Sequence, residues 1–172
     1  MSRARPRWQD VRALIMDVDG VLTDGGLYYT EHGDELKRFD VRDGQGLVLL
    51  RQAGILTAIV TGKRTTLVAR RAEELGIAEV HQGVGDKAVA VRELLARHGV
   101  APAAACYVGD DVNDLPALGV VGLGVAVADA VPVVRRAARY VTRASGGRGA
   151  IREVCDLILV SRRGRDRSRR ES

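Results

Sequence analysis

Short hydrophobic runs alternate with longer amphipathic segments along most of this 172-residue chain. Short apolar runs bounded by turn residues are typical of buried strands, whereas longer segments with apolar residues three or four positions apart are typical of helices. We expect strands at 12–17, 55–60, 79–82, 104–108 and 121–126, and helices near 44–53, 64–75, 86–98, 112–118, 131–138 and 148–160. This alternation indicates right-handed crossovers. It predicts an α/β fold, a single-domain doubly wound parallel sheet of the Rossmann-like kind.

One segment, residues 25–44, interrupts the alternation with the sequence GGLYYTEHGDELKRFDVRDG. Two short stretches flank EHGD, in which Gly33 can supply the positive φ that a tight turn needs. We expect a β-hairpin over about 27–39, projecting from the end of the first strand. A two-stranded hairpin is marginally stable alone in water, so this one is expected to pack on something, with a neighbouring subunit as the candidate. It holds three of the chain's few aromatic residues, Tyr28, Tyr29 and Phe39.

The formal charge of +5 at pH 7 is concentrated at the two ends of the chain. Residues 161–172 carry +4 and Arg3, Arg5 and Arg7 add +3, which leaves residues 8–160 at −2. We therefore expect a disordered basic tail over 1–10, one folded domain over 11–160 and a disordered Arg-rich tail over 161–172. The acidic body makes nucleic acid an unlikely partner of the folded domain.

Two cysteines, Cys106 and Cys155, lack the spacing of a metal or redox motif and are expected to be buried thiols in a reducing compartment. The N-terminus has no apolar signal region, and no run approaches the roughly 18 apolar residues that a membrane span needs. The sequence therefore predicts a soluble cytoplasmic protein with no membrane partner.

Polar residues follow the predicted strands in a regular way. The carboxyl ends of parallel strands meet at one edge of the sheet, which is where such folds bind ligands. Asp17 and Asp19 follow the first strand, and IVTGKR at the second strand brings Thr61, Gly62, Lys63 and Arg64. A later GDK provides Lys87, one of only three lysines among 27 basic residues, and GDDVNDLPAL after the fourth strand provides Asp110, Asp111 and Asp114.

These residue types favour phosphoryl transfer with magnesium. Mg²⁺ prefers oxygen ligands, and Asp17 with Asp110 could supply two carboxylates. A carboxylate can attack phosphorus to form an aspartyl-phosphate, and Asp19, on the same side of an extended chain, could protonate the leaving oxygen and later activate water. The Thr61 hydroxyl and the Lys87 ammonium would hold the transferring phosphoryl group.

Each motif alone has an ordinary structural explanation, such as a strand-to-turn junction or a helix cap. Two other functions also use such residues. A signalling receiver domain carries acidic residues, Thr and Lys around a phosphorylated Asp, although its acceptor would be expected after a later strand. A catalytically silent interaction domain is the second alternative, and the intact set of Asp17, Asp19, Lys87 and Asp110 argues against it.

Taken together, DVDGVLTDG, IVTGKR, GDK and GDDVNDLPAL resemble the four ordered motifs of the haloacid dehalogenase superfamily phosphatases. The resemblance implies a nucleophile and Mg²⁺ ligand at Asp17, a general acid/base and metal-site residue at Asp19, and a ligating carbonyl at Val18. It further implies that Asp110 is the second metal-ligating carboxylate and that Asp111 and Asp114 support the metal shell. The implied phosphate-binding residues are Thr61, Gly62 and Lys87.

Residues 11–160 more closely resemble the 3-deoxy-D-manno-octulosonate 8-phosphate phosphatases of lipopolysaccharide sugar synthesis, through segments such as GGLYYTEHGDELKRFDVRDGQG and YVTRASGGRGAIREVCDLIL. This resemblance implies a capless homotetramer in which the hairpin of one subunit closes the active site of another. It also implies substrate-binding residues at Arg42, Asp43, Gly44, Arg64 and Arg148. DDVNDLPAL resembles at least as closely the phosphatases of nine-carbon 2-keto sugar acid 9-phosphates and the phosphatase-like domain attached to some sialic acid cytidylyltransferases. The eight-carbon and nine-carbon substrates therefore both remain open.

Overall fold

A parallel β-sheet forms the centre of the molecule in a computed structural model that describes residues 7–170, with side chains as far as residue 164. Within these residues the sheet has six strands in the order β5–β4–β1–β6–β7–β8. The strands are β1 (Ala13–Met16), β4 (Leu56–Thr61), β5 (Glu79–Gln82), β6 (Ala105–Gly109), β7 (Leu123–Ala126) and β8 (Tyr140–Val141). The predicted doubly wound α/β fold is confirmed.

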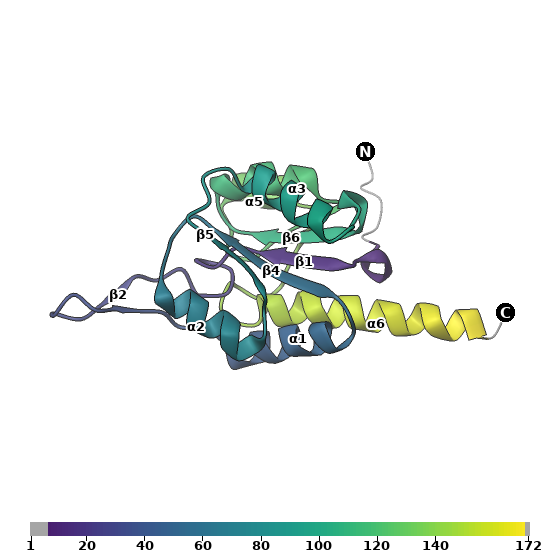
Figure 1. The fold of residues 1–172 in the computed structure, drawn as a ribbon, viewed down its shortest axis with the longest axis horizontal. Coiled ribbons are helices and arrows are strands. Elements are labelled where there is room, and N and C mark those ends of the chain that lie inside the picture. The colour runs from purple at the N-terminus through teal and green to yellow at the C-terminus, as the bar shows by residue number, and fades with distance from the viewer. Residues whose placement is uncertain (1–6, 171–172) are drawn as a thin grey trace.

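Helices cover both faces of the sheet. Figure 1 shows α1, α2 and α6 on one face and α3 and α5 on the other. The helices are α1 (Val41–Gln52), α2 (Thr66–Leu75), α3 (Lys87–Arg97), α4 (Leu115–Val120), α5 (Pro132–Ala137) and α6 (Ala150–Arg170). Short 3₁₀ turns η1 (Trp8–Asp10), η2 (Pro102–Ala104) and η3 (Val112–Asp114) link them to the strands. Asp40, Thr65 and Asp86 begin α1, α2 and α3 by accepting backbone N–H groups of the first turn.

The register of the central strands decides where the functional residues lie. All four residues of β1 are buried, and Met16 pairs with Ile59 of β4 and with Val108 of β6. The three strands therefore end at the same level. The residues at and just after these ends, Asp17, Thr61 and Asp110, are brought to one edge of the sheet.

The hairpin consists of β2 (Tyr28–Tyr29) and β3 (Glu35–Leu36), which pair antiparallel and project from the body beside the carboxyl ends of the strands (Figure 1). Gly33 adopts a φ of 88° in its turn, as predicted. Leu27, Tyr29 and Leu36 are each more than half exposed. The hairpin thus presents apolar side chains to its surroundings instead of to the core.

Both ends of the chain differ from the tails that the sequence predicted. Residues 1–6 and 171–172 lie outside the described residues, but Trp8 is buried and its ring packs edge-on against Tyr140, with the centroids 5.2 Å apart. At the other end α6 continues beyond residue 160 to Arg170. Arginine is a good helix former, and the Arg162 guanidinium donates to the Val11 carbonyl, so packing extends the helix past the expected end. No helix within residues 7–170 combines the length and the apolar character needed to cross a membrane.

Candidate active site

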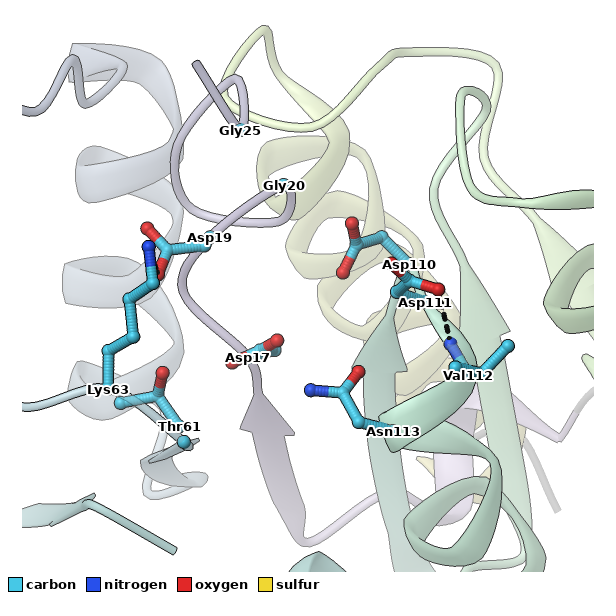
Figure 2. A pocket seen from close by; sticks show the side chains of 11 residues that line it. Asp17, Asp19, Gly20, Gly25, Thr61, Lys63, Asp110, Asp111, Val112 and Asn113 are labelled. Carbon is cyan, nitrogen blue, oxygen red and sulfur yellow. Dashed lines mark hydrogen bonds and ion pairs between the residues drawn. The ribbon is translucent and has the colours of Figure 1, made fainter. Parts of the chain in front are cut away.

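A pocket of about 330 Å³ opens where β1, β4 and β6 end. Its lining includes six residues that the sequence predicted, namely Asp17, Asp19, Thr61, Gly62, Asp110 and Asp111. Figure 2 shows Asp17 at the end of its strand, between Asp19 and Lys63 on one side and Asp110, Asp111 and Asn113 on the other. The sheet therefore gathers carboxylates from two separate strand ends around one cavity.

Lys87 connects the two groups of carboxylates beneath the pocket. It is the first residue of α3, and its side chain is only 2% exposed. Its ammonium lies 2.8 Å from Asp17 Oδ2 and 2.7 Å from Asp114 Oδ1. Burial alone would lower the pKa of Lys87, but the charges of Asp17 and Asp114 outweigh this effect and raise the pKa. The residue is therefore a fixed cation beside the nucleophile candidate.

Both carboxylate oxygens of Asp114 accept hydrogen bonds from protein groups. Its Oδ1 also accepts from the Tyr107 hydroxyl at 2.6 Å, and its Oδ2 accepts from the backbone N–H groups of Asp110 and Asp111 at 2.8 and 3.3 Å. Its carboxylate is fully buried. Asp114 consequently holds Lys87 and the Asp110 loop in position and has little capacity left for a ligand.

Asp17 and Asp110 lie in an environment that disfavours their negative charges. Burial is the largest cause in both cases, and repulsion from Asp114 adds to it. The pKa of Asp17 is raised despite the attraction of Lys87, and the pKa of Asp110 is raised to about 7. A cation or a cationic ligand between these two carboxylates would relieve the repulsion.

The donor set fits a divalent cation. Oxygen atoms of Asp17, Asp110 and Asp114 lie within 4.8 Å of one another. Across the described residues, Asp17 Oδ1 is the only buried side-chain polar atom without a hydrogen-bond partner. Gly20 closes the site from above, because a Cβ at that position would collide with the Asp110 carboxylate. A small oxygen-lined site with one unpaired buried oxygen is a suitable place for a hard cation.

Asp19 faces a different set of partners. Its Oδ1 lies 2.5 Å from the ammonium of Lys37, which follows β3 of the hairpin, and its Oδ2 lies 3.9 Å from the ammonium of Lys63. The Lys37 side chain is 2% exposed and also contacts Glu35 at 3.2 Å. Burial would lower the pKa of Lys37, and its bonds to Asp19 and Glu35 more than compensate, so the pKa is raised. The hairpin thus supplies a charged group to the pocket of its own subunit.

The Val18 carbonyl does not suit the predicted role of metal ligand. It accepts the backbone N–H groups of Val21, Leu22 and Thr23 at 2.9 to 3.1 Å and so lies inside the turn that follows β1. Because this turn places Gly20 over Asp110, the carbonyl is committed to shaping the loop. The prediction is corrected accordingly.

The residues predicted to contact substrate lie away from the pocket lining. Arg42 and Arg148 are exposed and line a second cavity, of about 430 Å³, beside α6. Arg64 is exposed and packs over Gly83. Any contact of these three arginines with substrate remains a prediction.

The other two predicted substrate-binding residues, Asp43 and Gly44, make contacts within the fold, and their contact with substrate stays a prediction. Asp43 is buried, and its carboxylate accepts the Arg152 N–H at 2.8 Å and the Gly149 N–H at 3.3 Å, so it caps the start of α6. Gly44 is buried where a Cβ would collide with Arg71 on α2. Both residues therefore help to hold α1 against α2 and α6.

Sequence reasoning missed several residues of the pocket. Gly20, Gly25, Val112 and Asn113 line it, and Tyr107 supports it from below. Lys63, which the sequence places with Thr61 and Gly62 at a strand end, lines the pocket as expected. Lys37 gave no comparable signal, since only the folding of the hairpin brings it to Asp19.

The fold and this site define a haloacid dehalogenase-like hydrolase, and the sequence profile of that family matches residues 72–152. The chain is 52% identical over 155 residues to 3-deoxy-D-manno-octulosonate 8-phosphate phosphatase KdsC of Yersinia pestis, covering 90% of this chain and 83% of that protein. It is 47% identical over 164 residues to the Escherichia coli K12 protein of the same name, covering 95% and 87%. The chain belongs to the 3-deoxy-D-manno-octulosonate 8-phosphate phosphatase family.

Solved structures agree with this membership. The crystal structure of the Yersinia pestis phosphatase superimposes with a TM-score of 0.89 at 51% identity, over 91% of this chain and 84% of that one. The Moraxella catarrhalis phosphatase, in complex with a magnesium ion, a phosphate ion and a KDO molecule, gives a TM-score of 0.89 at 41% identity, over 93% and 92%. The capless sheet with its hairpin is therefore the architecture of this family.

Proposed function

We propose that this chain is a Mg²⁺-dependent phosphatase that hydrolyses 3-deoxy-D-manno-octulosonate 8-phosphate through an aspartyl-phosphate on Asp17. One observation supports this above all others. This chain belongs to the phosphatase family, and its Asp17 places one oxygen 2.8 Å from the buried Lys87 ammonium while the other oxygen has no hydrogen-bond partner. A carboxylate that is oriented by a cation and still has an unused oxygen is suited to attack phosphorus.

The proposed reaction has two balanced steps. A carboxylate oxygen of Asp17 bonds to phosphorus while the bond from phosphorus to the sugar oxygen breaks, and Asp19, which enters this step in its protonated form, gives its proton to that departing oxygen. Water then attacks the phosphorylated Asp17, and Asp19 takes the proton that the water releases, so that inorganic phosphate leaves and both aspartates return to their starting states. Lys87, the Thr61 hydroxyl and the backbone at Gly62 would hold the phosphoryl oxygens throughout.

We propose that Asp17 and Asp110 hold the Mg²⁺ ion, whose bound charge would neutralise the phosphoryl oxygens. Oxygen atoms of Asp17, Asp110 and Asp114 that lie within 4.8 Å of one another, and the raised pKa of Asp110, support this choice. Any contribution of Asp19 would come from its backbone, because its carboxylate faces the two lysines. Asp111 and Asp114 would support the loop that carries Asp110.

The proposed substrate follows from the names of the relatives, and from the magnesium ion, phosphate ion and KDO molecule bound to the Moraxella catarrhalis phosphatase. Arg64, Arg42 and Arg148 stay candidates for the sugar carboxylate, because a guanidinium binds a carboxylate with two parallel hydrogen bonds. The runner-up substrate is a nine-carbon 2-keto sugar acid 9-phosphate, which differs by one hydroxymethylene group.

One assay tests both the reaction and the substrate. Phosphate release would be measured from the eight-carbon and the nine-carbon ester, each with Mg²⁺ and with EDTA. We expect Mg²⁺-dependent release with preference for the eight-carbon ester. A preference for the nine-carbon ester would preserve the chemistry and change the substrate, and no release from either would refute the proposed function.

We further propose a homotetramer in which the hairpin of one subunit packs near the active site of another. The exposure of Leu27, Tyr29 and Leu36 on this one projecting element supports the proposal, since exposed large apolar side chains are available for contact with a partner. A cytoplasmic location is also proposed, supported by the two buried thiols Cys106 and Cys155.

A further inference from the structure

We propose that Lys37 is a positioning residue for the acid/base step, through which the hairpin of a subunit controls Asp19 in the same subunit. The proposal rests on the proposed phosphatase function and concerns a residue to which neither the sequence motifs nor that function gives a role. Its starting point is the 2.5 Å contact between the Lys37 ammonium and Asp19 Oδ1.

The burial of Lys37 shows that its charge has a specific use. An ammonium group with a side chain only 2% exposed is costly to desolvate unless it is paired, and an apolar side chain of the same length would pack at this position without that cost. Lys37 forms two pairs, one to Asp19 in the pocket and one to Glu35 on β3 at 3.2 Å. The ammonium therefore bridges the hairpin and the active-site loop.

The two lysines around Asp19 are not equivalent. Lys63 is 54% exposed and its ammonium lies 3.9 Å from Asp19 Oδ2, so this pair is loose and screened by solvent. Lys37 is buried and in close contact with the other oxygen. The orientation of the Asp19 carboxylate is consequently set by Lys37.

This contact has a chemical consequence at one moment of the reaction. When Asp19 gives its proton to the departing sugar oxygen, negative charge develops on its carboxylate. The Lys37 ammonium already faces Asp19 Oδ1, so it stabilises the charge that develops on this carboxylate without reorganisation. Esters with a poor leaving group, such as a sugar alcohol, need this proton, whereas an aryl ester with a good leaving group does not.

The dependence on the leaving group gives a test that a purely structural role would not pass. We would compare kcat/KM for 3-deoxy-D-manno-octulosonate 8-phosphate and for p-nitrophenyl phosphate in the wild type and in Lys37→Met, at saturating Mg²⁺. General acid catalysis contributes roughly 10²- to 10⁴-fold. We expect Lys37→Met to lower kcat/KM for the sugar ester by roughly 10- to 100-fold and for the aryl ester by less than about threefold.

The matched control is Glu35→Gln, which removes the other partner of Lys37 and leaves the contact with Asp19. If Lys37 only anchors the hairpin, both variants lower kcat/KM for the two esters to the same degree, and the proposal is overturned. A second measurement places Lys37→Met in an Asp19→Asn background. In that background we expect no further loss of kcat/KM for either ester, because Lys37 acts through Asp19. Additive losses of kcat/KM would contradict the proposal.

The outcome also separates this proposal from the proposed function. If the wild type hydrolyses neither ester, both are overturned together. If the wild type is active and Lys37→Met lowers kcat/KM for the two esters equally, the phosphatase function stands and the positioning role of Lys37 is refuted.

Discussion

The active site has an inner half around Asp17 and an outer half around Asp19, and the two halves are positioned by different parts of the molecule. The inner half is held by the sheet and α3, through Lys87, which is buried beneath the pocket between Asp17 and Asp114. The outer half is held by Lys37, from a hairpin whose paired strands are only two residues long. The proposed nucleophile Asp17 therefore depends on the core, whereas the proposed acid/base residue Asp19 depends on a projecting element.

The largest expected effect lies in the inner half, at Asp17→Asn. This nearly isosteric change removes the proposed nucleophile and should lower phosphate release by roughly 10⁴-fold or more. The variant should remain folded, because Lys87 keeps its contact with Asp114. Phosphate release and circular dichroism would be measured beside Asp156→Asn, which alters only a half-exposed pair on α6. Activity of Asp17→Asn within a few-fold of wild type would rule out the nucleophile.

Lys87→Met should damage both stability and activity. It leaves two buried carboxylates without their cation, which typically costs about 3–5 kcal/mol. It also removes the proposed phosphate contact, worth roughly 10²- to 10³-fold in rate. Urea unfolding in EDTA would measure the first effect. Lys63→Met is the control, since its loose exposed pair with Asp19 should contribute less than about 1 kcal/mol. Equal destabilisation by the two variants would contradict the central role of Lys87.

The outer half is tested by changing the hairpin surface. Leu27→Ser combined with Tyr29→Ser should weaken the proposed tetramer by roughly 10²-fold or more, because buried anchors at interfaces contribute about 2 kcal/mol each. Light scattering would follow the mass, with Val89→Ser on α3 as a control for an exposed apolar residue outside the hairpin. A double variant that retains the mass of the wild type would exclude the hairpin as the contact surface.

The smallest expected effect is the pH dependence of Mg²⁺ binding. Burial and the neighbouring carboxylates raise the pKa of Asp110 to about 7, so below pH 7 this proposed ligand holds a proton that Mg²⁺ must displace. Affinity should fall about tenfold per pH unit below 7 and level off above it. Without Mg²⁺, the charged form is disfavoured in the folded state, so the contribution of this group to stability falls as the pH rises from about 4 to 7.

Isothermal titration with Mg²⁺ between about pH 5.5 and 8 would measure this dependence. Asp110→Asn should bind weakly and lose the inflection near pH 7. An inflection that persists in Asp110→Asn would assign the proton to another group.

The sequence alone predicted the inner half well, for a physical reason. Asp17, Thr61 and Asp110 each lie at the end of a strand, and parallel strands in register must bring such residues together. Lys87 begins a helix after another predicted strand, and so follows the same rule. The order of strands and helices was predictable because periodicity reports burial directly.

Other features depend on tertiary contacts that no local pattern records. Lys37 reaches Asp19 only because the hairpin folds back, and Asp43 caps a helix that begins more than a hundred residues later. The Val18 carbonyl was assigned to a metal because a motif indicates which residues are near a site and not where each carbonyl points. The helical continuation of α6 likewise depends on the contact between Arg162 and Val11.

The cap that Asp43 provides for α6 has a consequence for synthesis of the protein on the ribosome. Its carboxylate accepts N–H groups of Gly149 and Arg152, and the Arg38 guanidinium donates to the Gly147 carbonyl. These contacts close loops of more than a hundred residues, so α1 lacks its packing partner until residue 152 has left the exit tunnel. One face of the sheet must therefore wait for nearly the whole chain, and during elongation its apolar surface is available to chaperones.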